Sequence, residues 1–212
     1  MRKWIPAVLI LSAVIASILV YPQLPERIPT HWSASGEVNG WSSRLWGAWV
    51  LPLIMAVTFL ILRAVPHIDP RKANYAKFSG MYDALIILIL GFLLVVHGVI
   101  LANAAGVPVR VDRIMMPLVG VFIVAIGFLV PRAHPNWFVG IRTPCTLTSD
   151  LSWERTHKVG GPLLVVFGIL MIAAGFIAPE QAIWVLVTAA VALVAFLFVY
   201  SYQVWITDPS KR

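Results

Sequence analysis

Glu154 and His157 place an acid and a base three positions apart, on one face of a predicted helix. A Glu-x-x-His spacing builds a two-metal carboxylate site in helical bundles when a second copy faces it, and the sequence has no second copy. Ser149, Asp150 and His157 are the residue types of a hydrolytic triad. On a helix, however, Asp150 and His157 would lie about 10 Å apart along the axis, too far for the hydrogen bond that a triad needs. These residues therefore do not predict an enzyme.

The five histidines are the other candidates for metal chemistry. The sequence contains no His-Glu-x-x-His and no paired Cys-x-x-Cys, and its one cysteine, Cys145, cannot form an internal disulfide. We therefore expect no catalytic residue, no metal and no cofactor. What the polar side chains do depends on the elements that position them.

Composition identifies those elements as membrane helices. Of 212 residues, 60% are hydrophobic and 12% are charged, whereas soluble domains have about 45–50% and about 25%. Six apolar runs are near the roughly 20 residues that a helix needs to cross a bilayer. They are residues 4–20, 45–64, 84–104, 114–130, 162–178 and 182–205. The sequence therefore predicts an all-α integral membrane protein, a bundle of six transmembrane helices.

Lysine and arginine are distributed unequally between the two sides of this predicted bundle. Cytoplasmic loops carry the excess of these residues. One side has twelve and the other has four, namely Arg27, Arg44, Arg110 and Arg113. The twelve are Arg2, Lys3, Arg63, Arg71, Lys72, Lys77, Arg132, Arg142, Arg155, Lys158, Lys211 and Arg212. Both termini are therefore predicted to be cytoplasmic, and the net charge of +7 indicates orientation and contact with membrane lipids rather than direct nucleic-acid binding.

The chain divides into three predicted parts. Residues 1–65 form a two-helix unit with an extracellular loop at 21–44, residues 66–113 hold the third helix and its flanking loops, and residues 114–212 hold helices four to six. The last part contains a cytoplasmic loop at 131–161. The two loops are the segments with enough polar pattern to carry function.

The outer loop contains LPERIPTHWSASGEVNGWSSR, residues 24–44. Its prolines prevent a continuing helix, and Asn39-Gly40 predicts a tight turn, so the segment should fold back on itself. One interpretation is that its tryptophans anchor the loop at the lipid headgroups. The other is that His31, Glu37 and the tryptophan surface, Trp32 and Trp41, recognise something arriving from outside.

The inner loop contains PNWFVGIRTPCTLTSDLSWERTHKVGGP, residues 135–162. Ser149 is a good N-cap and Gly160-Gly161-Pro162 is a typical stop, so a short helix is expected over 150–159. On it, Glu154 and Lys158 have the spacing of an ion pair, and Arg142 could reach Glu154 or Asp150. This helix could lie on the membrane surface, or it could form a docking surface, which requires exposed Arg142, Trp153 and His157.

His97 is an ionisable side chain deep in a predicted membrane helix, which makes it a functional candidate. A hydrogen bond from the imidazole to a neighbouring helix explains it more simply. The alternative is a small-solute or proton-linked transporter. Transporters show glycine or proline breaks in matching positions of two halves, whereas Gly91, Gly127, Gly168 and Gly175 look scattered.

The two loops together resemble the SdpI family of bacterial immunity proteins. The resemblance lies in LPERIPTHWSASGEVNGW, similar to an amino-terminal domain of unknown function common in the family, and in NWFVGIRTPCTL followed by WERTHKVGG. Two positions depart from the family pattern: Asn39 stands where an acid is expected, and Cys145 where an aromatic is expected. The family positions are Pro29, His31, Gly36, Gly40 and Trp41 outside, and Asn136, Gly140, Arg142, Thr143, Pro144, Trp153, His157 and Gly161 inside.

The resemblance implies a function at the bacterial cell membrane. It implies protection against a secreted toxic peptide, SdpC-like in kind, and signal transduction by holding a small winged-helix autorepressor at the membrane. It implies no enzymatic activity and no cofactor.

Overall fold

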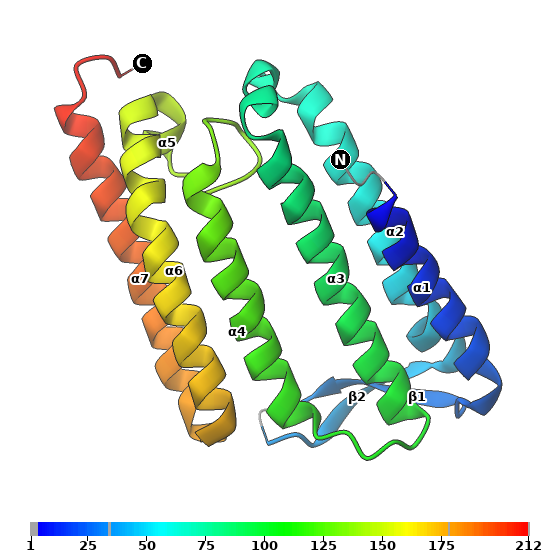
Figure 1. Cartoon of the computed structure of the whole chain (residues 1–212). Coiled ribbons are helices and arrows are strands. Elements are labelled where there is room, and N and C mark those ends of the chain that lie inside the picture. Colours follow the sequence, from blue (N-terminus) through cyan, green and yellow to red (C-terminus); the bar gives the residue numbers. More distant parts are fainter. Residues whose placement is uncertain (1–3, 34, 178, 212) are drawn as a thin grey trace.

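The structure is a computed structural model that describes residues 4–33, 35–177 and 179–211. Within these residues, six helices are long and apolar enough to cross a membrane, which confirms the predicted bundle (Figure 1). Arg2, Lys3 and Arg212, three of the residues used to predict orientation, lie outside the described residues. The membrane helices are α1 (Ile5–Val20), α2 (Arg44–Ile68), α3 (Ser79–Ala104), α4 (Val111–Leu129), α6 (Asp150–Ile177) and α7 (Pro179–Thr207).

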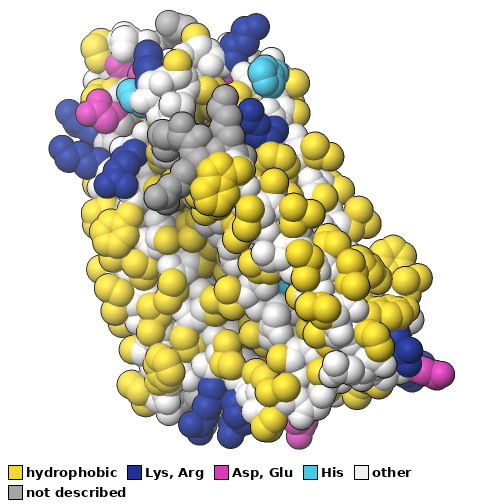
Figure 2. Space-filling view, turned by 45° about the vertical axis from the view of Figure 1, so that its right-hand side comes forward, with side chains coloured by type: hydrophobic (Ala, Val, Ile, Leu, Met, Phe, Trp, Pro, Cys, Tyr) yellow, Lys and Arg dark blue, Asp and Glu magenta, His cyan; other side chains and the backbone are white. Residues whose placement is uncertain are grey.

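The remaining elements are short and lie at the two ends of the bundle. One end, the hairpin end, carries β1 (Arg27–Trp32) and β2 (Val38–Ser43), reached from α1 through the 3-10 turn η1 (Tyr21–Gln23). The other end, the loop end, carries η2 (Lys72–Lys77), η3 (Val130–Arg132) and the single-turn helix α5 (Pro144–Thr148). Figure 2 shows hydrophobic side chains over the middle of the molecule and charged side chains gathered toward both ends, as expected for a protein that crosses a bilayer.

The membrane helices pack as two helix groups. The first helix group is α1, α2 and α3, and the second is α4, α6 and α7, with α3 beside α4 between them (Figure 1). The third helix, which the sequence analysis placed in a separate part, thus packs against the first two. Phe92 of α3 and Phe122 of α4 contact each other across the boundary, with ring centroids 4.7 Å apart. Toward the loop end, a buried core continues across this boundary to Ala133 and Trp153.

Glycines let α4 and α6 approach each other closely. A Cβ added at Gly168 would lie 2.6 Å from the carbonyl oxygen of Gly120, and one added at Gly127 would lie 2.8 Å from that of Gly161. We call these four residues the glycine seam. Gly120 and Gly127 are seven residues apart on α4, and Gly161 and Gly168 are seven residues apart on α6, so each pair lies on one face of its helix. The two faces meet, and the interpretation of Gly127 and Gly168 as scattered is therefore wrong.

The outer segment forms an antiparallel two-stranded hairpin, so it does fold back as predicted. The turn, however, is not at Asn39-Gly40. The chain reverses between Ser33 and Glu37, with Gly36 at φ 84°, and Gly40 lies inside β2 opposite His31. A Cβ at Gly40 would lie 2.7 Å from the Cβ of His31, so this glycine permits two strands to approach rather than making a turn.

The predicted short helix over 150–159 is wrong, because α6 continues without interruption through Pro162 to Ile177. Gly160 packs under the side chain of Ile141, and Gly161 packs against Pro131 and Gly127. The glycines are therefore packing positions, and tertiary contact overrides their local tendency to stop a helix. Proline inside a membrane helix is tolerated when neighbours satisfy the freed carbonyl group.

Candidate functional sites

A groove at the hairpin end separates the two helix groups. Its volume is about 650 Å³, and it is walled by α3 on one side and by α4, α6 and α7 on the other. We call it the hairpin groove. Residues Thr30, His31, Trp32 and Ser33 of the hairpin close one end. The helix walls are entirely apolar: Val96, Val99, Ile100, Val111, Met115, Met116, Val119, Ile123, Phe167, Met171, Ile183, Leu186, Val187 and Ala190.

The hairpin positions its groove-lining residues through its own strand pairing. His31 Nδ1 lies 2.5 Å from the side-chain oxygen of Asn39 on the facing strand, which fixes the direction of the imidazole. The hydroxyl of Ser33 accepts from the backbone N–H of Glu37 across the turn, at 3.2 Å. Asn39, where the resemblance leads us to expect an acid, is therefore the side-chain partner of His31. The hairpin end of the groove is an ordered wall.

The sequence analysis named seven outer residues, and the structure separates them by position. His31 and Trp32 line the hairpin groove. Pro29 is buried, and Gly36 and Gly40 shape the hairpin. Glu37 and Trp41 are exposed away from the groove lining, with 57% of Trp41 accessible.

At the loop end, Trp153 and His157 are buried, each 1% exposed, so they cannot form the exposed docking surface that the sequence analysis expected. Their rings stack with centroids 4.1 Å apart, and Trp153 Nε1 donates to the carbonyl oxygen of Ala133 at 2.8 Å. His157 Nε2 accepts from the backbone N–H of Ile141 at 3.0 Å, which leaves Nδ1–H to donate to the carbonyl oxygen of Trp153 at 2.8 Å. The two side chains thus hold the segment Ala133–Thr143, which we call the connecting loop.

Gly140 explains why the connecting loop can lie so close to α6. Its φ of 123° is a conformation that only glycine adopts readily, and a Cβ there would collide with His157 Nε2. Three residues later the loop becomes α5. Thr143 caps α5 through a reciprocal pair of hydrogen bonds with Thr146, and Pro144 occupies the first helical position, where its missing N–H costs nothing.

The start of the connecting loop is held by Asn136, which is fully buried. Its side-chain oxygen accepts from the backbone N–H groups of Phe138 and Val139, at 2.9 and 2.7 Å, and its amide donates to two carbonyl oxygens. Every hydrogen-bonding position of this side chain is used. Asn136 therefore defines a turn and is not available to a partner.

A buried carboxylate, Asp69, joins the first helix group to this turn. Asp69 is 2% exposed and lies directly after α2. Its Oδ2 accepts from the hydroxyl of Tyr75 and from the backbone N–H of Trp137, both at 2.9 Å, and its Oδ1 accepts from the N–H of Arg71 at 2.7 Å. Burial, followed by the hydrogen bond to Asp69, raises the pKa of Tyr75 well above its usual range.

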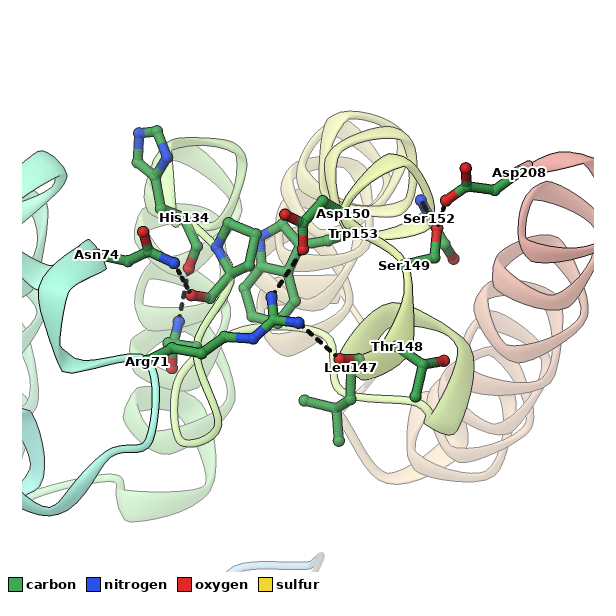
Figure 3. A network of polar contacts seen from close by, with 12 residues as sticks. Arg71, Asn74, His134, Leu147, Thr148, Ser149, Asp150, Ser152, Trp153 and Asp208 are labelled. Carbon is green, nitrogen blue, oxygen red and sulfur yellow. Dashed lines mark hydrogen bonds and ion pairs between the residues drawn. The ribbon is translucent and has the colours of Figure 1, made fainter. Parts of the chain in front are cut away.

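Arg71 makes a second connection between the helix groups, shown in Figure 3. Its guanidinium pairs with Asp150 at 2.7 Å and also donates to the carbonyl oxygen of Leu147 at 3.0 Å. Asp150 thus pairs with Arg71 and not with Arg142 as expected. Arg142 is exposed and donates to the carbonyl oxygen of Trp137 at 2.9 Å.

The exposed face of α6 near its start carries charge. Glu154, Arg155 and Lys158 are exposed, whereas Gly161 is buried in the glycine seam. Among the described residues, Arg71–Asp150 is the one ion pair, so the expected pair between Glu154 and Lys158 is not formed. The surface at the loop end is therefore defined by Arg142, Arg155 and Lys158 rather than by Trp153 and His157.

Comparison with known proteins matches both loops. The model of the SdpI/YfhL protein family matches residues 132–202, and that of a domain of unknown function, DUF1648, matches residues 8–56. The protein named "Immunity protein SdpI" of Bacillus subtilis (strain 168) is 25% identical over 204 residues, 96% of each chain. The chain thus resembles the SdpI family, through the segment that the family model matches and through similarity to one relative along nearly its whole length. It is a multi-pass bacterial membrane protein. No solved structure matches it.

The SdpI segment holds the connecting loop, α5, α6 and most of α7, and polar contacts tie these elements together. The hydroxyls of Thr143 and Ser201 lie 2.8 Å apart, and Ser149 donates to the carboxylate of Asp208 at 2.5 Å (Figure 3). The Ser149 hydroxyl and then Ser210 hold the pKa of Asp208 below its usual value. Burial raises the pKa of the Cys145 thiol, so this cysteine is not an activated nucleophile.

His97, which lies between the two matched segments of the chain, is buried inside the first helix group. Its Nε2 lies 2.9 Å from Ser17 Oγ on α1, and that hydroxyl donates to the carbonyl oxygen of Ala48 on α2 at 2.6 Å. The prediction that its imidazole is hydrogen-bonded to a neighbouring helix is confirmed. His97 does not line the hairpin groove.

Asp69, Tyr75 and the roles of Arg71 and Asp208 were not predicted from the sequence. Asp69 and Arg71 lie between the two matched segments, and their partners are 68 and 79 residues away along the chain. Asp69 directly precedes Pro70 at the end of a membrane helix, where an acidic residue is normally interpreted as an exposed group at the membrane interface. Arg71 contributed to the prediction only as a positive charge on the cytoplasmic side, because its partner Asp150 comes close only in the folded protein.

Proposed function

We propose that this protein is a membrane immunity protein that protects the cell against a secreted toxic peptide, and that the hairpin groove receives the peptide. The observation that carries this proposal is the groove itself, an apolar hollow between two helix groups, closed at one end by an ordered hairpin. The relative from Bacillus subtilis is named an immunity protein. A peptide that enters or attacks a membrane presents apolar side chains, which such a groove can bind.

The lining suits an amphipathic peptide. Met115, Met116 and Met171 have flexible, polarisable side chains that adapt to irregular apolar surfaces. At the hairpin end, Thr30 and His31 can form hydrogen bonds with polar atoms of the occupant. The volume of about 650 Å³ is enough for a few large side chains, within the range of about 300–1,000 Å³ typical of ligand sites.

The same lining argues against a small-solute or proton-linked transporter. His31 is the one ionisable side chain among the described residues that line the groove. Along the apolar helix walls a polar solute would lose its hydration without finding hydrogen-bond partners, which is costly. The groove therefore favours an apolar, peptide-like occupant.

Resistance measurements test this proposal with a matched pair of variants. Val119 lines the hairpin groove, whereas Val121, two residues along α4, is 55% exposed and does not line it. We expect Val119→Trp to fill the groove and abolish survival of a sensitive strain challenged with an SdpC-like toxic peptide. Val121→Trp, at equal membrane levels, should protect like the wild type. Equal protection by both variants would remove the groove as the recognition site.

The hairpin residues allow a second test of the same site. Because His31 lines the groove and Trp41 does not, His31→Ala should reduce resistance more than Trp41→Ala. A larger loss with Trp41→Ala would instead place recognition on the exposed face of the hairpin.

A second proposed activity is docking of a cytoplasmic winged-helix autorepressor at the loop end. It is supported by the exposed cations Arg142, Arg155 and Lys158, of which Arg142 is held by a hydrogen bond, and by the charge bias that predicts this end to be cytoplasmic. We expect Arg142→Ala/Arg155→Ala to lose repressor in a pull-down from membranes. Lys77→Ala, a charge change on η2, is the control. Equal capture by the wild type and the double variant would exclude this surface.

A further inference from the structure

Several polar contacts cross from the first helix group to the second at the loop end, among them that of Asn74 with the carbonyl oxygen of Pro135, and two of them begin directly after α2. In one, the buried Asp69 carboxylate accepts from the backbone N–H of Trp137. In the other, Arg71 binds Asp150 and the carbonyl oxygen of Leu147 (Figure 3). We call these contacts the clasp. Its residues on the side of the first helix group, Asp69 and Arg71, are separated by one residue in the chain. Its partners on the second lie in the connecting loop, at the end of α5 and at the start of α6.

The clasp continues to the exposed surface through one residue, Trp137. Trp137 donates its N–H to Asp69 and accepts, through its carbonyl oxygen, from Arg142. The side chain of Arg142 is thus positioned by a loop residue that the first helix group holds. A displacement of Asp69 relative to α6 must either carry Trp137 with it or break one of these hydrogen bonds.

The two ends of the boundary between the helix groups differ in character. Toward the loop end the boundary is filled, by the clasp and by the core that includes Tyr75, Phe78 and Trp153. At the hairpin end the same boundary is open as the hairpin groove. Closely packed interfaces resist gradual deformation. If the distance between the two helix groups changes at the hairpin groove, we therefore expect each group to move as a rigid body and to rotate about the α3–α4 contact.

We propose that the clasp couples the spacing of the two helix groups at the hairpin groove to the position of the connecting loop, and therefore of Arg142. Asp69 is the positioning residue of this device, because its buried carboxylate accepts hydrogen bonds both from Tyr75 of η2 and from the backbone of Trp137 in the loop. The use of the device in signalling rests on the proposed function, since it would connect an occupant of the groove to the docking surface. The coupling itself does not depend on that function.

Coupling is reciprocal, which gives a test without any toxic peptide or repressor. If spacing at the groove controls the clasp, then breaking the clasp must change spacing at the groove. Spin labels at Gly98→Cys on α3 and Ile114→Cys on α4, in a Cys145→Ser background, report that spacing in lipid nanodiscs. Both sites are exposed, and a side chain at Gly98 meets no atom within 4 Å.

We expect Asp69→Ala to shift the distance distribution between the labels by about 2 Å or more. Arg71→Ala should shift it in the same direction, and this variant leaves the buried carboxylate in place if Asp69→Ala folds poorly. The control is Asp83→Ala on α3, an acid that makes no hydrogen bond or ion pair in the part of the chain that the structure describes. Unchanged distances with both Asp69→Ala and Arg71→Ala would overturn the proposal.

Hydrogen exchange at the connecting loop completes the test. With Asp69→Ala, the amide of Trp137 loses its acceptor, so exchange over Trp137–Ile141 should rise by about tenfold or more. Asp69→Asn retains one oxygen and should restore part of the protection. Faster exchange with no change in label distance would mean that Asp69 acts only locally, and would refute the coupling. Loss of peptide resistance or repressor capture plays no part in either result, so failure of the proposed function is seen separately.

Discussion

Adding a methyl group at a glycine of the seam should lower the free energy of unfolding, whereas adding one at an open glycine elsewhere on the membrane helices should raise it. At Gly168 a Cβ would lie 2.6 Å from the carbonyl oxygen of Gly120 and 2.8 Å from the backbone nitrogen of Val124. Both are backbone atoms of α4, so the contact is relieved only if the helices move apart. At Gly91 on α3 a Cβ meets nothing within 4 Å.

The magnitude follows from two terms. Replacing glycine by alanine inside a helix stabilises by about 0.5–1 kcal/mol, and this term is common to both sites. Overpacking a tight contact costs about 1–3 kcal/mol, and this term applies only at Gly168. We therefore expect Gly91→Ala to raise the free energy of unfolding by about 0.5–1 kcal/mol. Gly168→Ala should lower it by up to about 2 kcal/mol.

The assay is equilibrium unfolding of purified protein in mixed micelles, followed by helical ellipticity at increasing fractions of denaturing detergent. Because the helix term cancels, the difference between the two variants isolates the steric cost of the seam. Gly168→Ala at least as stable as Gly91→Ala would refute close packing of α4 and α6 through glycine.

Three further outcomes are expected. Trp153→Phe retains the stacked ring but leaves a buried carbonyl oxygen without its donor, so the same unfolding assay should show a loss of about 1–3 kcal/mol. Gly40→Ala should separate the strands beside His31, since its Cβ would lie 2.7 Å from that side chain, and hydrogen exchange of β1 amides should increase. The pKa of Asp208 is lowered in the folded protein, so its carboxylate contributes stability above the unfolded pKa, and this contribution is lost as the pH falls from about 4 through the lowered value. Ser149→Ala should flatten that part of a plot of unfolding free energy against pH.

The helices could be predicted from the sequence because a bilayer imposes a simple rule. Backbone polar groups must be satisfied within each crossing segment, so long apolar runs become helices whatever their neighbours are. The fold-back of the outer segment was predictable, since its prolines end the helix and Asn39-Gly40 indicates a turn. The position of its turn was not, because Asn39 and Gly40 take their roles from His31 on the facing strand.

The candidate site at the loop end was predictable only in part. Trp153, His157, Asn136 and Gly140 were identified as important, but as a surface, whereas they are a buried support for the connecting loop. Burial depends on contacts between residues far apart in the chain, such as Asp69 with Trp137, and local pattern contains no information about them. A continuous α6 was missed because the glycines and the proline were assigned their usual local effect.

The hairpin has a consequence for how this protein is made. Ile28 of β1 is completely buried, and the space beside it exists because residue 47 of α2 has no side chain, since a Cβ there would lie 2.9 Å from Ile28. The strands therefore complete their packing only against a helix that is synthesised after them. The packing that surrounds Ile28 is complete only once α2 is in place beside the strands. Assembly of the groove wall is thus a late event in biogenesis, and a variant such as Gly47→Val would be inserted normally in the membrane yet remain unfinished at its hairpin end.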